Sequence, residues 1–64
     1  MTIEVYHTLT PVEIQTILSE VPNPNRVTVL PHSDGTTYLV TTTVEEDADT
    51  ILDVLHRLGY DAEM

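Results

Sequence analysis

The sequence has no cysteine, tryptophan, phenylalanine or lysine, and its two basic residues are both arginine. Without cysteine the chain can form no disulfide, no thiolate metal site and no cysteine nucleophile. Without lysine, and with only two glycines, it lacks a phosphate-binding loop and an amine base. No apolar run approaches the roughly 20 residues of a membrane span, and no signal-peptide pattern opens the chain. We therefore expect a cytoplasmic protein that binds no cofactor and is not an enzyme.

Positive charge is also scarce, since eleven acidic side chains stand against two basic ones and the formal net charge is −9 at pH 7. A field of this sign repels nucleic acid and anionic membranes and attracts cationic surfaces. We therefore expect the partner to be a basic, nucleic-acid-binding protein surface, with no direct contact to nucleic acid or membrane. Five of the acids fall within nine positions of the second half: Glu45, Glu46, Asp47, Asp49 and Asp53.

The first half of the chain begins with a strand pattern and continues with a helix pattern. Residues 2–9 alternate between apolar and polar side chains, which predicts a half-buried strand with His7 on its inward side. Thr10 and Glu13 have the spacing of a capping box, so a helix is expected to start there. Its apolar stripe extends to Val21.

The second half is expected to contain a hairpin, a helix and a final strand. Two β-branched segments, 26–30 and 36–43, are separated by a turn that ends in Asp34-Gly35, a pair that favours hairpins. The helix that follows can be capped by Thr43, with Glu46 as box partner, or by Asp47. Gly59 suits the position just after this helix, and residues 60–64 are long enough for an edge strand.

The order of these elements, β-α-β-β-α-β, predicts an α+β fold of the ferredoxin-like type, formed by a single domain over residues 1–64. Such a domain has a four-stranded antiparallel sheet with two helices on one face, and right-handed crossovers place the first and third strands in its centre. The uncovered face of the sheet can stay hydrated or dimerise, and we expect a monomer rather than a homodimer. The residues expected on that face are Tyr6, Thr28, Leu30, Leu39 and Thr41, rimmed by Glu4, Asp61 and Glu63.

The polar side of the second predicted helix is the candidate partner-binding surface. Glu45, Asp49 and Asp53 are four residues apart, so their side chains stack about 6 Å apart along the axis and imitate a line of phosphates. An ordinary solvated helix face is the alternative, but such faces mix charges of both signs. Here Arg57 is the only basic residue of the helix. The partner-binding residues predicted are Glu45, Glu46, Asp47, Asp49 and Asp53, with Asp61 and Glu63 as secondary contacts.

The histidines do not have the spacing of a metal site. His7, His32 and His56 fall on a strand, a turn and a helix, and none has a second ligand at the i, i+4 spacing that zinc sites use. We therefore predict no metal site.

Two resemblances to known families can be stated. The segment Leu58-Gly59-Tyr60-Asp61-Ala62-Glu63 resembles the last helix–strand junction of heavy-metal-associated domains, which share this length and element order. Those domains bind metal through a Cys-x-x-Cys loop after the first strand. The corresponding residues here, Thr8-Leu9-Thr10-Pro11, include no cysteine. This resemblance therefore implies the fold and no metal site.

In size, charge and lack of a catalytic set, the chain also resembles small acidic phage-encoded inhibitors, the anti-CRISPR and anti-restriction proteins that imitate DNA. This resemblance implies a protein of the host-cell cytoplasm that blocks the DNA-binding groove of a defence complex. One such groove is the surface on which a type I CRISPR effector reads the protospacer-adjacent motif (PAM). The alternative is a ferredoxin-like binding or regulatory module adapted to high salt, whose acidic residues carry no information about a partner.

Overall fold

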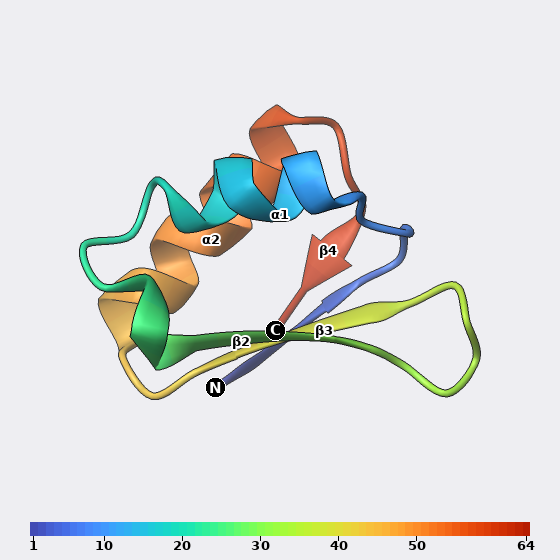
Figure 1. Cartoon of the computed structure of the whole chain (residues 1–64), viewed down its shortest axis with the longest axis horizontal. Helices are drawn as coiled ribbons and strands as arrows, with labels where there is room; N and C mark the ends of the chain where they lie inside the picture. Colours follow the sequence, from blue (N-terminus) through green and yellow to red (C-terminus); the bar gives the residue numbers. More distant parts are fainter.

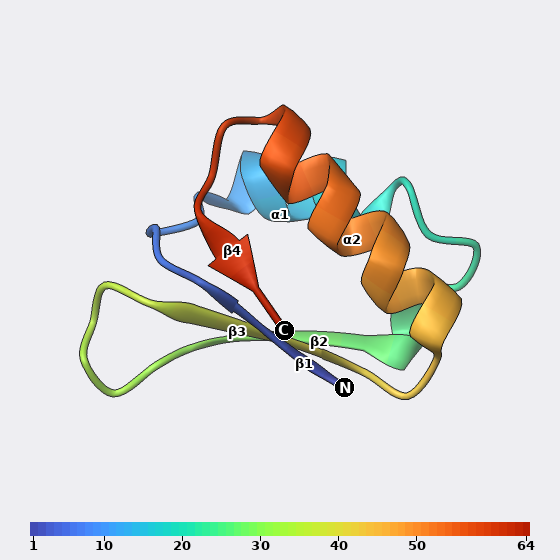
Figure 2. The same cartoon turned by 180° about the vertical axis from the view of Figure 1, so that it is seen from behind.

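The chain forms one four-stranded sheet and two α-helices in a computed structural model that describes all residues 1–64. The sheet order is β2-β3-β1-β4, every neighbouring pair is antiparallel, and both helices lie on the same side of the sheet (Figure 1, Figure 2). The predicted α+β class and the central positions of the first and third strands are confirmed. The elements are β1 (Thr2–Val5), α1 (Pro11–Leu18), the 3₁₀ turn η1 (Pro24–Arg26), β2 (Val27–Pro31), β3 (Tyr38–Thr42), α2 (Glu45–Arg57) and β4 (Ala62–Glu63).

Strand β1 is shorter than the alternating segment from which it was predicted. Its ladder with β3 ends where Val5 faces Tyr38, the first residue of β3. Beyond this point the alternation no longer describes the backbone, so the prediction that His7 faces inward is wrong. His7 is exposed, and its ring stacks on Tyr60 with 4.4 Å between ring centroids.

Helix α1 starts as the capping box predicts. The Thr10 backbone N–H donates to Glu13 Oε1 at 2.9 Å, and the Glu13 N–H donates to Thr10 Oγ1 at 3.3 Å. These two bonds satisfy donors that the first turn would otherwise leave unpaired. The helix ends at Leu18, before the end of its apolar stripe, yet Val21 is still buried.

The turn between β2 and β3 is organised by Asp34 and Gly35. Gly35 has φ +77°, a left-handed value that glycine adopts without strain. The Asp34 carboxylate accepts from the backbone N–H groups of Thr36 and Thr37, both at 2.9 Å, and from the Thr37 hydroxyl at 2.8 Å. Because these N–H groups are engaged in the turn, β3 begins at Tyr38 rather than at the predicted residue 36.

Helix α2 has no side-chain cap, so both predicted caps are wrong. Val44 occupies the N-cap position, and its backbone N–H donates to Thr42 Oγ1 at 3.2 Å. The acids of the first turn stabilise this end in another way, because they lie near the positive end of the helix dipole.

The other end of α2 agrees with the prediction. Gly59 follows the helix with φ +86°, and its N–H donates to the His56 carbonyl at 3.0 Å. The Tyr60 N–H donates to the Leu55 carbonyl at 3.0 Å, which completes a Schellman motif. This motif turns the chain back toward β4, which is two residues long instead of the five predicted.

The hydrophobic core lies between the helices and the sheet. Helix α2 packs against β1, β3 and β4, whereas α1 packs mainly against α2. Neither helix has the length and apolar composition needed to cross a bilayer. The buried core residues are Ile3, Val5, Leu9, Ile17, Val21, Val40, Ala48, Ile51, Val54, Leu55 and Ala62.

Candidate partner-binding surface

Four predicted acids share the outer side of α2 and are exposed: Glu45, Glu46, Asp49 and Asp53. Consecutive helix residues are about 100° apart, so these four side chains fall within an arc of about 100°. The arc lies opposite the buried positions Ala48, Ile51 and Leu55. We call these four residues the helix acidic face.

Asp47, the fifth predicted acid of this helix, does not belong to the helix acidic face. It is only 3% exposed, and its Oδ2 lies 3.2 Å from Arg26 Nη2. Two positions after Glu45, it sits on the inward side of the first turn, where Arg26 reaches it from η1. A buried and neutralised carboxylate cannot contact a partner, so Asp47 is removed from the predicted binding residues.

Both arginines of the chain are engaged with acids. Arg26 pairs with Asp47, and Arg57 Nε lies 3.1 Å from Asp53 Oδ2, one turn away on α2. The second pair is exposed, so it only partly neutralises Asp53. Glu45, Glu46 and Asp49 therefore have no ion-pair partner.

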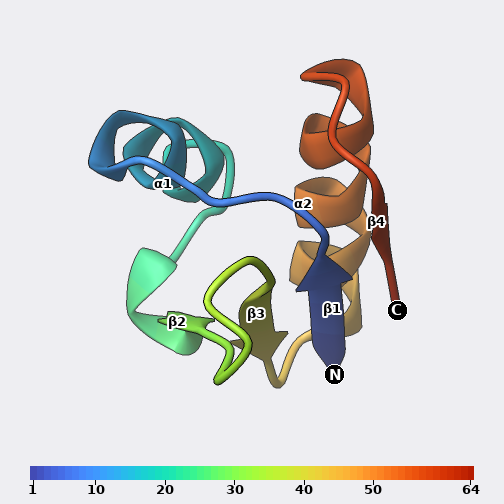
Figure 3. The same ribbon diagram turned by 90° about the vertical axis from the view of Figure 1, so that its right-hand side faces the viewer.

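Strand β4 lies beside α2 (Figure 3). The His56 ring contacts it directly, with Nε2 2.9 Å from the Ala62 carbonyl oxygen. Because side chains alternate along a strand and Ala62 is buried toward the helix, Glu63 points to the other face of the sheet. Glu63 therefore does not extend the helix acidic face, contrary to the prediction. Asp61 is exposed just before the strand.

On that other face Glu63 is joined to Glu4 by Tyr6. Glu4 and Glu63 are direct cross-strand neighbours, and the Tyr6 hydroxyl lies 2.9 Å from Glu4 Oε2 and 2.7 Å from Glu63 Oε1. Like charges in this position repel each other, and a hydroxyl between them offsets part of the repulsion. The hydrogen bonds to Glu63 and then Glu4 raise the pKa of Tyr6 above its usual range, because they stabilise the neutral phenol. Glu4 was expected only at the rim of this face, although its i, i+2 spacing to Tyr6 indicates that the two side chains share it.

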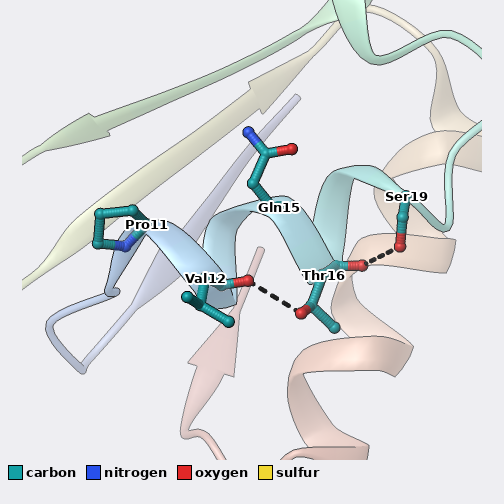
Figure 4. A pocket seen from close by; sticks show the side chains of 5 residues that line it. All are labelled: Pro11, Val12, Gln15, Thr16 and Ser19. Atoms are coloured by element: carbon teal, nitrogen blue, oxygen red, sulfur yellow. Dashed lines mark hydrogen bonds between the residues drawn. The ribbon is translucent and has the colours of Figure 1, made fainter.

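A shallow hollow lies on the solvent side of α1, lined by Pro11, Val12, Gln15, Thr16 and Ser19 (Figure 4). All five come from one helix or its end. The Thr16 hydroxyl donates to the Val12 carbonyl at 2.9 Å, and the Ser19 hydroxyl donates to the Thr16 carbonyl at 2.7 Å. Since its hydroxyl groups bond to their own helix instead of converging on a common point, the hollow has no features of a small-molecule site.

No three histidine, aspartate or glutamate side chains lie close enough together to hold a metal ion. His32 is in the hairpin turn, near Asp34, whereas His7 stacks on Tyr60.

Protein-family models, curated protein sequences and solved structures give no match to this chain.

Proposed function

We propose that this protein is a DNA-mimic inhibitor whose helix acidic face occupies the nucleic-acid-binding groove of a basic protein. The groove of a host defence complex, such as the PAM-reading surface of a type I CRISPR effector, is the proposed target. One observation carries the proposal: Glu45, Glu46 and Asp49 are exposed on one side of a helix, and both arginines are paired with other acids.

The spacing of these carboxylates supports a phosphate-like role. Glu45, Asp49 and Asp53 recur one turn apart, about 6 Å along the axis, on a helix of 13 residues. Phosphates of B-DNA recur about every 3.4 Å along one strand, so the helix presents a sparser line of the same sign. Long-range attraction between such a line and a lysine- and arginine-lined groove speeds association.

The energetics of α2 point the same way. Like charges four residues apart destabilise a helix by a few tenths of a kcal/mol per pair. The helix dipole offsets this for the first turn, and Arg57 offsets part of it at Asp53. Asp49 has neither compensation, and a charge that lowers stability is expected where binding uses it.

The test is a competition assay between this protein and a PAM-containing duplex for a purified type I effector complex. The wild-type protein is expected to displace the duplex, and the triple variant Glu45→Lys/Glu46→Lys/Asp49→Lys is expected to lose displacement. Asp49→Lys alone is compared with Glu20→Lys, which makes the same charge change at an exposed site outside α2. Asp49→Lys should weaken inhibition, and Glu20→Lys should leave it nearly unchanged. Inhibition that survives the triple reversal would refute the role of α2.

A second candidate is a binding or regulatory module adapted to high salt. The observation in its favour is that exposed acids also occur away from α2, at Glu4 and Glu63 on the sheet, Asp34 in the turn and Glu20 after α1. Thermal melts in dilute buffer and in molar salt separate the two candidates. A salt-adapted domain needs molar salt to fold, whereas a DNA mimic folds in dilute buffer and loses its partner as salt rises.

A further inference from the structure

The side of the sheet opposite the helices is uncovered (Figure 2). The strand registers pair Leu30 with Leu39, Leu39 with Glu4, and Glu4 with Glu63. These four residues therefore form one row across β2, β3, β1 and β4, which we call the sheet row. Adjacent strands are about 4.8 Å apart, so the leucine pair and the glutamate pair are centred about 10 Å from each other.

The leucine end of the sheet row is open to solvent. Leu30 is 58% exposed and Leu39 is half-buried. The next row consists of three exposed threonines, Thr28, Thr41 and Thr2, so apolar and hydroxyl groups cover this half of the face. None of these five side chains carries a charge.

The glutamate end of the sheet row carries two negative charges and no positive one. The Tyr6 hydroxyl, within 2.9 Å of both carboxylates, keeps Glu4 and Glu63 in a fixed arrangement. Neither arginine is on this face, since Arg26 and Arg57 pair with acids of α2. The row is thus apolar at one end and uniformly anionic at the other.

We infer that the sheet row docks an amphipathic basic helix of a protein partner. An arginine of that helix would bind Glu4 and Glu63, because a guanidinium donates paired hydrogen bonds to carboxylates. An apolar side chain about seven positions away, some 10.5 Å along the helix, would cover Leu30 and Leu39. Charge selects this occupant over a second copy of the chain, which would bring a further net charge of −9 to an anionic face. The inference shares with the proposed function the premise that the partner is cationic.

The test uses nuclear magnetic resonance and two synthetic peptides of equal composition. The first is a capped, alanine-based helix with two leucines one turn apart and two arginines farther along the same face. The second carries the two arginines on the opposite face. The methyl groups of Leu30 and Leu39 report the sheet row, and the backbone amides of residues 45–53 report the helix acidic face. The first peptide is expected to bind and to shift the signals of the two leucine methyls. The second is expected to bind with an affinity at least about tenfold lower, measured from the same methyl signals.

Two variants with matched controls complete the test. Leu30→Thr should weaken binding of the first peptide about tenfold, and Val12→Thr, which alters an exposed apolar residue of α1, should not. Glu63→Gln should weaken it severalfold, and Glu20→Gln, which removes the same charge elsewhere, should not. Shifts confined to residues 45–53 would overturn the sheet-row inference and leave the proposed function standing. Equal binding of both peptides, or leucine methyl shifts that depend on protein concentration without peptide, would also overturn it.

Discussion

Arg26 and Asp47 form an ion pair that joins the end of η1, directly before β2, to the first turn of α2. The Arg26 Nη2 atom lies 3.2 Å from Asp47 Oδ2, and the aspartate side chain is 4% exposed while the arginine side chain is 42% exposed. The pair therefore holds a buried carboxylate in place with a cation that still contacts water. Removing the cation leaves the carboxylate buried without a partner, which is more unfavourable than never burying it.

We expect Arg26→Gln to lower the free energy of unfolding by about 2 kcal/mol, measured by urea denaturation. Adding Asp47→Asn to this variant should recover part of the loss, because it removes the unpaired charge. Arg57→Gln breaks the exposed Arg57–Asp53 pair and serves as the control, with an expected loss of at most about 0.5 kcal/mol. Equal losses in the two single variants would show that Asp47 does not depend on its partner.

The capping box of α1 gives a second prediction. Thr10→Ala is expected to lower the free energy of unfolding by about 1 kcal/mol, and Thr10→Ser by less, because serine keeps the capping oxygen. Thr16→Ala, in the same helix, is the control and should be neutral or stabilising, since alanine favours helix more than threonine. A comparable loss from both alanine variants would contradict a specific role for the cap.

The same cap should depend on pH. The hydrogen bond from the Thr10 backbone N–H lowers the pKa of Glu13 below its usual value of 4.5. The stabilisation is therefore fully present above the unfolded value and is lost as the pH falls through the lower folded value. In acid, the difference in stability between the wild type and Glu13→Gln should shrink, as urea titrations at several pH values can show.

Asp34 gives a fourth prediction, also in acid. Hydrogen bonds from the Thr36 and Thr37 N–H groups and the Thr37 hydroxyl lower the pKa of Asp34 from 3.8 to about 2. Its contribution to stability is present above pH 3.8 and is lost as the pH falls through about 2. The Asp34 carboxyl carbon should titrate near this lower value by nuclear magnetic resonance.

A variant can confirm that this titration acts on folding. Asp34→Asn should flatten the dependence of unfolding free energy on pH in this acid range. Asp61→Asn, which alters an exposed acid that accepts no side-chain hydrogen bond, should leave the dependence unchanged. An Asp34 that titrates at its ordinary value would show that the turn bonds do not persist in solution.

The Tyr6 hydroxyl gives a fifth prediction, in alkali. Because hydrogen bonds to Glu63 and Glu4 raise the pKa of Tyr6, Glu63→Gln should lower that pKa toward the usual 10.0. The ring carbon that carries the hydroxyl reports the titration by nuclear magnetic resonance. Glu46→Gln, on the opposite side of the molecule, should have no effect. An identical Tyr6 titration in the wild type and Glu63→Gln would mean that the two carboxylates are not joined through this hydroxyl, and would weaken the sheet-row inference as well.

The features that could be predicted from the sequence are those made by residues near one another in the chain. The Thr10–Glu13 box involves two side chains three positions apart, and the Gly59 motif and the Asp34-Gly35 turn are equally local. The element order and the class of the fold could also be predicted. Apolar residues that recur every 2 positions in a strand, or every 3.6 in a helix, indicate which face of the element is buried. The placement of Leu30 and Leu39 on the open face of the sheet follows from the same alternation.

Element ends were less predictable, because a neighbouring segment sets them. Strand β1 ends where its partner β3 begins, and β3 begins late because Asp34 engages the preceding N–H groups. The start of α2 was predicted from capping residues, yet Val44 holds the cap position while the Thr42 hydroxyl accepts its N–H.

The sequence alone determined the sign of the charge, its concentration in the second helix and the α+β class, since these depend on composition and short-range spacing. Only the tertiary structure decided which acids are available to a partner. Asp47 is removed from the surface by an arginine 21 positions away, and Glu63 is turned to the other face to meet Glu4, 59 positions away. The physical reason is that burial and charge pairing depend on distances in space, which helix and strand periodicity do not report.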